Sequence, residues 1–210
     1  MKTDDLIRVL ARDTLAEPPL VRGLMAGLVP ALAIALAGLL GVMGPRADLV
    51  QALANPLSVM RFVLGLALGA LALIAALRLA RPGQGRGVVL PVLVVPAVAG
   101  ALWIWAWVAT PDEGRQMAMV GKTLSACLTT IPALSVLPVV AGLLALRRGA
   151  PTRPALAGAM VGLGSGGLAA AIYALHCTED SPLFYVTWYG LAIVGVTLAS
   201  TLIGARALRW

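Results

Sequence analysis

The sequence predicts an all-α integral membrane protein, a bundle of six transmembrane helices preceded by a short cytoplasmic amphipathic helix. Apolar residues make up 60% of the 210 residues and charged residues only 12%, which is more apolar than a water-soluble domain can be. The 16 Lys and Arg residues stand between long apolar runs, as in the loops of polytopic membrane proteins. A nucleic-acid-binding protein gathers its basic residues on one face or arm, so we expect no nucleic-acid partner.

Six apolar runs are long enough to cross the hydrocarbon layer of a bilayer, which takes about 20 residues. We expect helices because an unpaired backbone is unstable in lipid and because strands of a membrane barrel alternate polar and apolar side chains, which these runs do not. The runs are residues 23–43, 59–80, 88–109, 125–146, 154–176 and 183–205. The chain therefore divides into an N-terminal segment, 1–22, and a six-helix transmembrane domain, 23–210.

Lys and Arg are distributed unevenly between the two sides of the predicted bundle. If the N-terminus lies inside the cell, twelve of them fall on the inner side and four on the outer side. Because basic residues favour the cytoplasmic side, we predict that both termini lie in the cytoplasm. No charged residue lies near the centre of a run, which argues against an ion-coupled transporter. The four outer basic residues are Arg46, Arg61, Arg115 and Lys122.

Residues 3–16 have the pattern of a short amphipathic helix. Thr3 is a suitable N-cap, and acidic residues follow it where the helix dipole favours negative charge. Two interpretations stay open. Either the helix lies on the inner leaflet of the bilayer, or its apolar stripe docks in a groove of a soluble partner. The stripe consists of Leu6, Ile7 and Leu10.

Glycines recur at four-residue intervals in the second and fifth runs. Small residues at this spacing let helices approach closely, so we expect packing faces there, and a homodimer through such faces stays open. The glycines are Gly65 and Gly69 in the second run, and Gly158, Gly162 and Gly166 in the fifth.

The two cysteines of the chain are predicted to meet at the outer boundary of the membrane. Cys127 lies 20 residues before the inner turn 147–153, and Cys177 lies 24 residues after it. At about 1.5 Å per residue each position is roughly 30–36 Å above the turn, one hydrocarbon thickness. A short turn makes the two helices antiparallel neighbours. If the side chains face each other, a Cα separation below about 7 Å permits a disulfide.

Three uses of this cysteine pair stay open. Each cysteine is a small apolar side chain buried in the core, or the two form a reversible dithiol–disulfide pair on the oxidising side of the membrane. With His176 as a third ligand, they bind a soft or borderline ion such as zinc, cadmium or copper(I). Glu179 belongs to the same polar stretch. We expect no obligatory cofactor, and a metal ion only as a signal.

The sequence offers little from which to build an active site, because it has one histidine and no CxxC, HExxH or P-loop motif. We therefore expect a protein that is not an enzyme. Two competing functions are a small transporter, which needs a polar cavity at mid-depth, and a membrane thiol oxidoreductase. The oxidoreductase normally needs a second cysteine pair to pass electrons onward.

Two stretches of the chain, together with the six runs and the cysteine in the fourth run, resemble the NrsF-type membrane anti-sigma factors. The resemblance covers essentially the whole chain. It implies a bacterial inner-membrane protein that holds an extracytoplasmic-function sigma factor inactive, through its cytoplasmic side, until stress arrives from outside. The two stretches are the opening Met1 to Ile7, and His176-Cys177-Thr178-Glu179 followed by Phe184 and Trp188-Tyr189.

The resemblance also assigns roles to particular residues. The two characteristic cysteines of the family carry over onto Cys127 and Cys177. From their position and chemistry we expect these to be the sensor thiols for oxidative or heavy-metal stress, with His176 and Glu179 as supporting residues. The N-terminal motif carries over onto the opening of the chain. The expected sigma-factor contacts are Lys2, Thr3, Asp4, Asp5, Leu6, Ile7 and Leu10.

Overall fold

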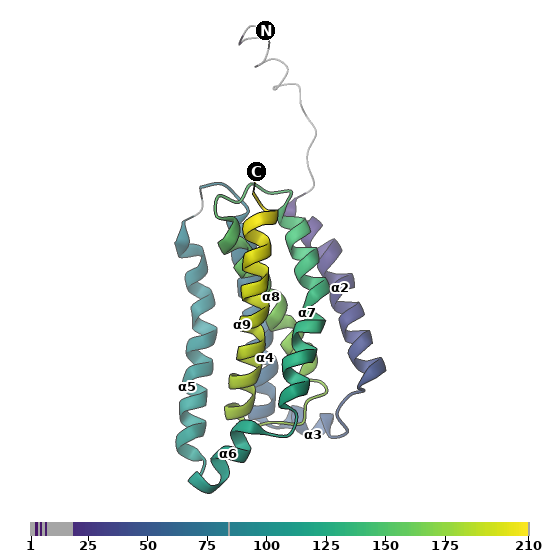
Figure 1. Ribbon diagram of the computed structural model, residues 1–210, viewed down its shortest axis with the longest axis vertical. Helices are drawn as coiled ribbons and strands as arrows, with labels where there is room; N and C mark the ends of the chain where they lie inside the picture. Colours follow the sequence, from purple (N-terminus) through teal and green to yellow (C-terminus); the bar gives the residue numbers. More distant parts are fainter. Residues whose placement is uncertain (1–2, 4, 6, 8–18, 84, 210) are drawn as a thin grey trace.

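The computed structural model describes residues 19–83 and 85–209, together with residues 3, 5 and 7 (Figure 1). In this part of the chain all regular structure is helical, and six segments are long and apolar enough to cross a membrane. The predicted fold class is therefore confirmed. The elements after the N-terminal segment are α2 (Leu20–Val42), α3 (Leu49–Ala54), α4 (Pro56–Leu79), η1 (Arg86–Leu93), α5 (Val94–Ala109), α6 (Asp112–Val120), α7 (Leu124–Leu146), α8 (Pro154–Tyr173) and α9 (Pro182–Ala207).

The six long helices run along one common axis, and the two short helices α3 and α6 lie together at one end of the bundle (Figure 1). We call this end, which also holds the α8–α9 connection, the distal end. The other end, where α2 begins and α9 finishes, is the proximal end. Among the described residues, the segments that the basic residues assign to the cytoplasm, 78–83, 147–153 and 206–209, lie at the proximal end.

Helix α8 is the centre of the bundle, because it packs against α2, α4, α7 and α9. Its glycines let two neighbours approach to backbone contact. A Cβ atom on Gly65 of α4 would lie 2.8 Å from the backbone oxygen of Gly167, and one on Gly158 would lie 2.6 Å from that of Ser200 in α9. The glycine faces are thus used within the chain, and the homodimer stays a prediction.

Two of the predicted runs differ from the observed helices. The third run begins as a 3₁₀ helix, η1, before α5 takes over, because Pro91 and Pro96 lack the N–H groups that a continuous α-helix needs. The fifth run ends at Tyr173 rather than at residue 176. Polar residues follow it, and Pro182 opens the next helix. Cys177 therefore lies in the folded loop between α8 and α9 and not at the end of a transmembrane helix.

Little of the predicted N-terminal helix can be compared with the structure. Thr3, Asp5 and Ile7 are helical and exposed. The other predicted sigma-factor contacts, Lys2, Asp4, Leu6 and Leu10, lie outside the described residues.

Candidate thiol site at the distal end

The structure brings the two cysteines together inside the distal end of the bundle. Cys127 lies in the first turn of α7 and Cys177 in the α8–α9 connection, and their side chains are 0% and 1% exposed. Both are free thiols, and they belong to one buried cluster of side chains. Tyr173 lies beside them, with its hydroxyl 3.5 Å from the Cys127 sulfur. The two sulfur atoms thus share one buried, largely apolar site.

The environment of the pair makes Cys177 the more acidic thiol. The neighbouring Cys127 thiol lowers the pKa of Cys177 to about 6, although burial acts in the opposite direction. A smaller contribution comes from the backbone amide of Glu179. Of the two thiols, Cys177 therefore forms the thiolate more readily, the form that attacks oxidants and binds metal ions.

We expect the stability of the reduced protein to depend on pH through Cys177. A thiol whose pKa is lower in the folded state adds stability as pH rises from the folded value, about 6, toward the ordinary value, about 8.5. The free energy of unfolding should rise across this window and fall again on acidification. Chemical unfolding in detergent at several pH values measures the slope. Cys177→Ser should remove it, and an unchanged slope in this variant would contradict the assignment.

An arginine clamp, made of Arg46 and Arg61 with Asp180, holds the connection that carries Cys177. Both arginines are buried, at 5% and 2% exposure. Arg46, from the α2–α3 connection, donates to both carboxylate oxygens of Asp180 at 2.8 and 3.0 Å and to the backbone carbonyl of Cys177 at 3.2 Å. Arg61, from α4, donates to the Glu179 carbonyl at 3.0 Å and pairs with Asp180 at 3.1 Å. Three separate elements are thereby fixed around the thiol pair.

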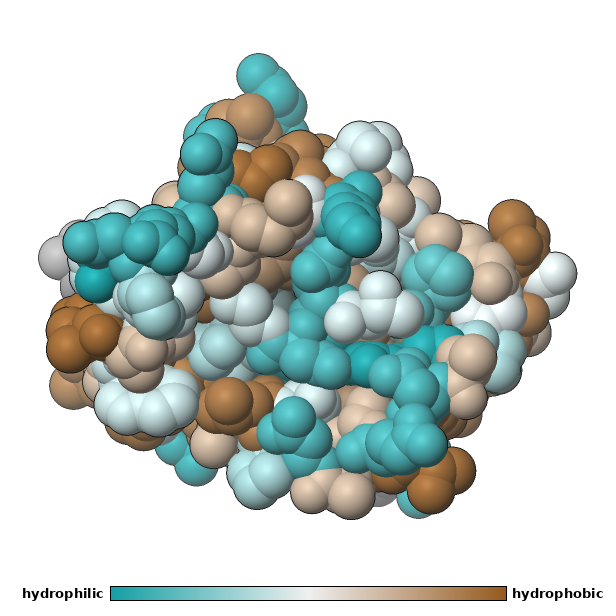
Figure 2. Space-filling view, turned by 90° about the horizontal axis from the view of Figure 1, so that it is seen from below, coloured by the Kyte–Doolittle hydropathy of each residue, from teal (hydrophilic) through white to brown (hydrophobic). Residues whose placement is uncertain are grey.

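The clamp also keeps its carboxylates ionised. Burial raises the pKa of Asp180, but the hydrogen bonds from Arg46 and the charges of both arginines outweigh it, so this pKa lies below its usual range. The hydrogen bond from Arg46 lowers the pKa of the exposed Asp48 to about 2. Figure 2 views the distal end face-on and shows hydrophilic residues gathered in a band across it.

The two predicted supporting residues have different positions. Glu179 accepts a hydrogen bond from the backbone N–H of Lys122 at 2.7 Å, which ties the connection to the start of α7. The ring of His176 lies 2.9 Å from the backbone oxygen of Gly44, at the end of α2. Among the described residues, no three His, Cys, Asp or Glu side chains are placed to hold one metal ion. The metal site with Cys127, Cys177 and His176 stays a prediction.

The clamp was not predicted from the sequence, where Arg46 and Arg61 count only as charges that mark one side of the membrane. One signal for Arg61 was present in the sequence. It lies inside an apolar run, and an ionisable residue in a transmembrane segment usually faces the interior of the bundle and has a partner there.

Comparison with known proteins assigns the family. The family model described as "NrsF: Negative regulator of sigma F" matches residues 10–210. The chain belongs to the NrsF family. It is 37% identical over 217 residues to the anti-sigma-F factor NrsF of Caulobacter vibrioides, with both chains covered completely. It is also 37% identical over 221 residues to the probable anti-sigma-F factor NrsF of Azospira oryzae, again over the full length of both. No solved structure matches the chain.

The NrsF assignment confirms two predictions from the sequence. The family resemblance that the sequence indicated is correct, over nearly the whole chain. The family consists of regulators and not of enzymes, so the prediction that this chain is not an enzyme is confirmed as well. The NrsF chain described here is thus a regulatory protein with six candidate membrane spans.

Proposed function

We propose that the protein is a membrane-bound anti-sigma factor that holds an extracytoplasmic-function sigma factor inactive and releases it when Cys127 and Cys177 react. The full-length similarity to two anti-sigma-F factors supports the sigma-factor partner. The sharing of one buried site by the only two cysteines supports the sensing role. The family favours this function over the small transporter and the membrane thiol oxidoreductase.

The proposed orientation places the proximal end in the cytoplasm and the thiol pair near the opposite face of a bacterial inner membrane. The distribution of basic residues supports it, because they concentrate in the proximal segments. The sigma factor then binds at the proximal end, through the N-terminal segment and the neighbouring loops. Signal and partner therefore act at opposite ends of the bundle.

Two reactions of the thiol pair are compatible with its chemistry. An oxidant such as hydrogen peroxide removes two electrons from the Cys177 thiolate and the Cys127 thiol, and a disulfide forms. The peroxide takes up the Cys127 thiol proton and one proton from solvent and is reduced to two water molecules. Alternatively, a soft cation such as Cd²⁺ binds both sulfur atoms and displaces the Cys127 thiol proton. Either reaction changes how α7 packs against the α8–α9 connection. Because both sulfur atoms are buried, the connection must open before either reagent reaches them.

A promoter that depends on the cognate sigma factor tests the sensing role. In cells with the natural protein, we expect hydrogen peroxide or Cd²⁺ to induce the promoter by about 5–150-fold, the range that a coupling of about 1–3 kcal/mol produces. Cys127→Ser and Cys177→Ser should abolish this induction. Ser135→Ala is the matched control, because Ser135 is buried in the same helix as Cys127 and bonds only to its own helix backbone.

The two halves of the proposal fail separately. If both cysteine variants respond like the natural protein to both reagents, the sensing role is wrong. Co-purification of the sigma factor with the protein, with and without residues 1–20, tests binding directly. If the full chain does not retain the sigma factor, the partner is wrong.

A further inference from the structure

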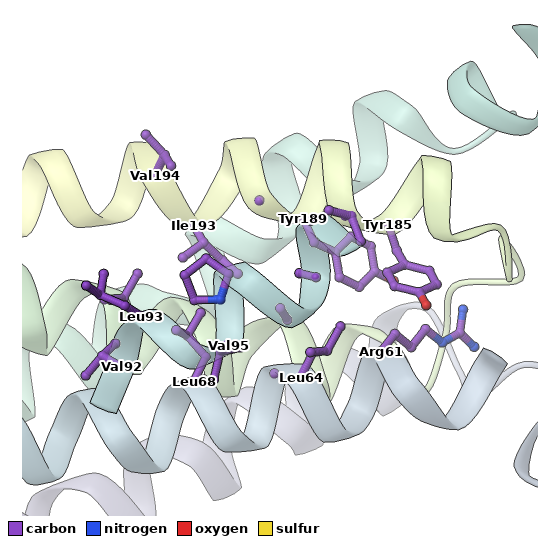
Figure 3. A pocket seen from close by; sticks show the side chains of 18 residues that line it. Arg61, Leu64, Leu68, Val92, Leu93, Val95, Tyr185, Tyr189, Ile193 and Val194 are labelled. Atoms are coloured by element: carbon purple, nitrogen blue, oxygen red, sulfur yellow. The ribbon is translucent and has the colours of Figure 1, made fainter. Parts of the chain in front are cut away.

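A pocket of about 310 Å³ lies beside the arginine clamp, between α4, α5 and α9 (Figure 3). Its wall is apolar except at one end, where Arg61, Tyr185 and Tyr189 lie together. Leu93 and Val194 lie at the other end. This volume is at the lower limit for small-molecule sites, so it suits one slender molecule. Nothing in the proposed sensing function uses this pocket.

Arg61 carries unused hydrogen-bond donors at the polar end of the pocket. Its side chain is 98% buried, and its Nη1 atom donates to the Glu179 carbonyl. The Nε and Nη2 atoms have no hydrogen-bond partner among the residues that the structure describes. In a guanidinium group, these two N–H groups form the side edge that binds both oxygens of one carboxylate or phosphate. The free edge therefore matches an anion with two oxygens.

The charges of this cluster balance, because Asp48 pairs with Arg46 and Asp180 pairs with both arginines. The Nε and Nη2 donors of Arg61 nevertheless lack acceptors among the described residues, and a buried donor without an acceptor costs free energy. Both atoms are enclosed, so a ligand reaches them through a shift of the neighbouring side chains. A bound anion would provide the missing acceptors.

The length of the pocket indicates what is attached to the anion. Along α9 the lining runs from Tyr185 to Val194, which is roughly 14 Å at 1.5 Å per residue. This is about half of the 30 Å hydrocarbon layer, the depth of one leaflet. One acyl chain fills such a space with its head at the distal end and its tail toward the middle of the membrane.

We propose that this pocket binds a long-chain fatty acid, with its carboxylate on the Nε and Nη2 edge of Arg61 and its chain between α4, α5 and α9. The inference does not depend on the sigma-factor partner or on the sensing role. A phospholipid offers its phosphate as the competing source of two anionic oxygens, but it brings two chains into a space suited to one.

Photo-crosslinking of the purified full-length protein tests the site. The probe is palmitic acid with a diazirine on its chain, and mass spectrometry locates the crosslinks. We expect saturable labelling of the pocket-lining residues of α4, α5 and α9. Unlabelled palmitate should compete, whereas its methyl ester, which lacks the charge, should compete about tenfold more weakly.

Two variants and one matched control show whether the pocket itself binds the probe. Arg61→Lys keeps the charge but loses the planar edge, and should lower the affinity about tenfold. Gly190→Leu fills the pocket from a position where a Cβ atom meets nothing within 4 Å, and should abolish labelling. Gly195→Leu, on the same helix and equally open but outside the pocket lining, should label like the natural protein.

Three results would overturn the inference. Labelling that does not saturate, or that survives Gly190→Leu, would place the probe elsewhere. Competition by lysophosphatidylglycerol that is stronger than competition by palmitate would replace the carboxylate with a phosphate. If Arg61→Lys does not fold, as judged by its thermal unfolding, the comparison of Gly190→Leu with Gly195→Leu still shows whether the probe binds in the pocket.

Discussion

We expect Arg46→Gln to lower the free energy of unfolding by about 1.5–3 kcal/mol, because Asp180 loses its charge-assisted hydrogen bonds from Arg46 and keeps only the ion pair with Arg61. Asp180 loses both hydrogen bonds from this side chain, and the carbonyl of Cys177 loses one. The connection that carries the thiols should then open more often. Chemical unfolding in detergent measures the stability, and the rate at which a maleimide labels Cys177 measures the opening.

Asp112→Asn is the matched control for the clamp. Asp112 also forms an ion pair with an arginine, Arg115, but its own side chain is 84% exposed. An exposed ion pair contributes about 0–1 kcal/mol, so this variant should unfold and label almost like the natural protein. Equal effects of the Arg46 and Asp112 variants would show that the clamp does not hold the connection.

Gly121→Ala should be similarly damaging, for a steric reason. Gly121 joins α6 to α7 with φ at +58°, a backbone conformation that strains any other residue. An added Cβ atom would lie 2.6 Å from the ring of Phe184 and 2.9 Å from the carboxyl carbon of Glu179. Backbone strain and overpacking each cost about 1–3 kcal/mol. The displaced Glu179 also belongs to the connection of Cys177, so maleimide labelling should accelerate as well.

Gly83→Ala separates the two contributions. Gly83 has a similarly positive φ of +82°, but a Cβ atom there meets nothing within 4 Å. Its substitution should cost only the backbone term, about 1–2 kcal/mol, and should leave the labelling of Cys177 unchanged. If Gly121→Ala costs no more than Gly83→Ala, the contacts with Phe184 and Glu179 are not restrictive.

The sequence predicted what depends on length and polarity. A run of some 20 apolar residues specifies a transmembrane helix by itself, and counting along two such helices placed both cysteines at one depth. The orientation of side chains in a connection is different. His176 precedes Cys177 directly, yet its ring lies against Gly44 while Cys177 contacts Cys127. Residue order alone does not determine which way neighbouring side chains point in a folded connection.

The arginine clamp was beyond prediction for a related reason. Arg46 and Asp180 are 134 positions apart in the chain, and their contact exists only because the α2–α3 connection folds across the distal end. The count of basic residues predicted on which side of the membrane Arg46 and Arg61 lie. It did not predict which side chains they pair with. The short helices α3 and α6 were missed as well, because six and nine residues are too few for a clear periodic pattern.

The attachment of His176 and the clamp to the end of α2 has a mechanical consequence. Helix α2 is 23 residues long and contains Pro30, and its length is roughly 35 Å at 1.5 Å per residue. It begins at Leu20, inside the N-terminal segment proposed to bind the sigma factor. A single helix therefore connects the two ends of the bundle. A displacement of the loop around Gly44 and Arg46 would move the proximal end of α2 through the helical backbone. It would not require a series of side-chain rearrangements between the two ends.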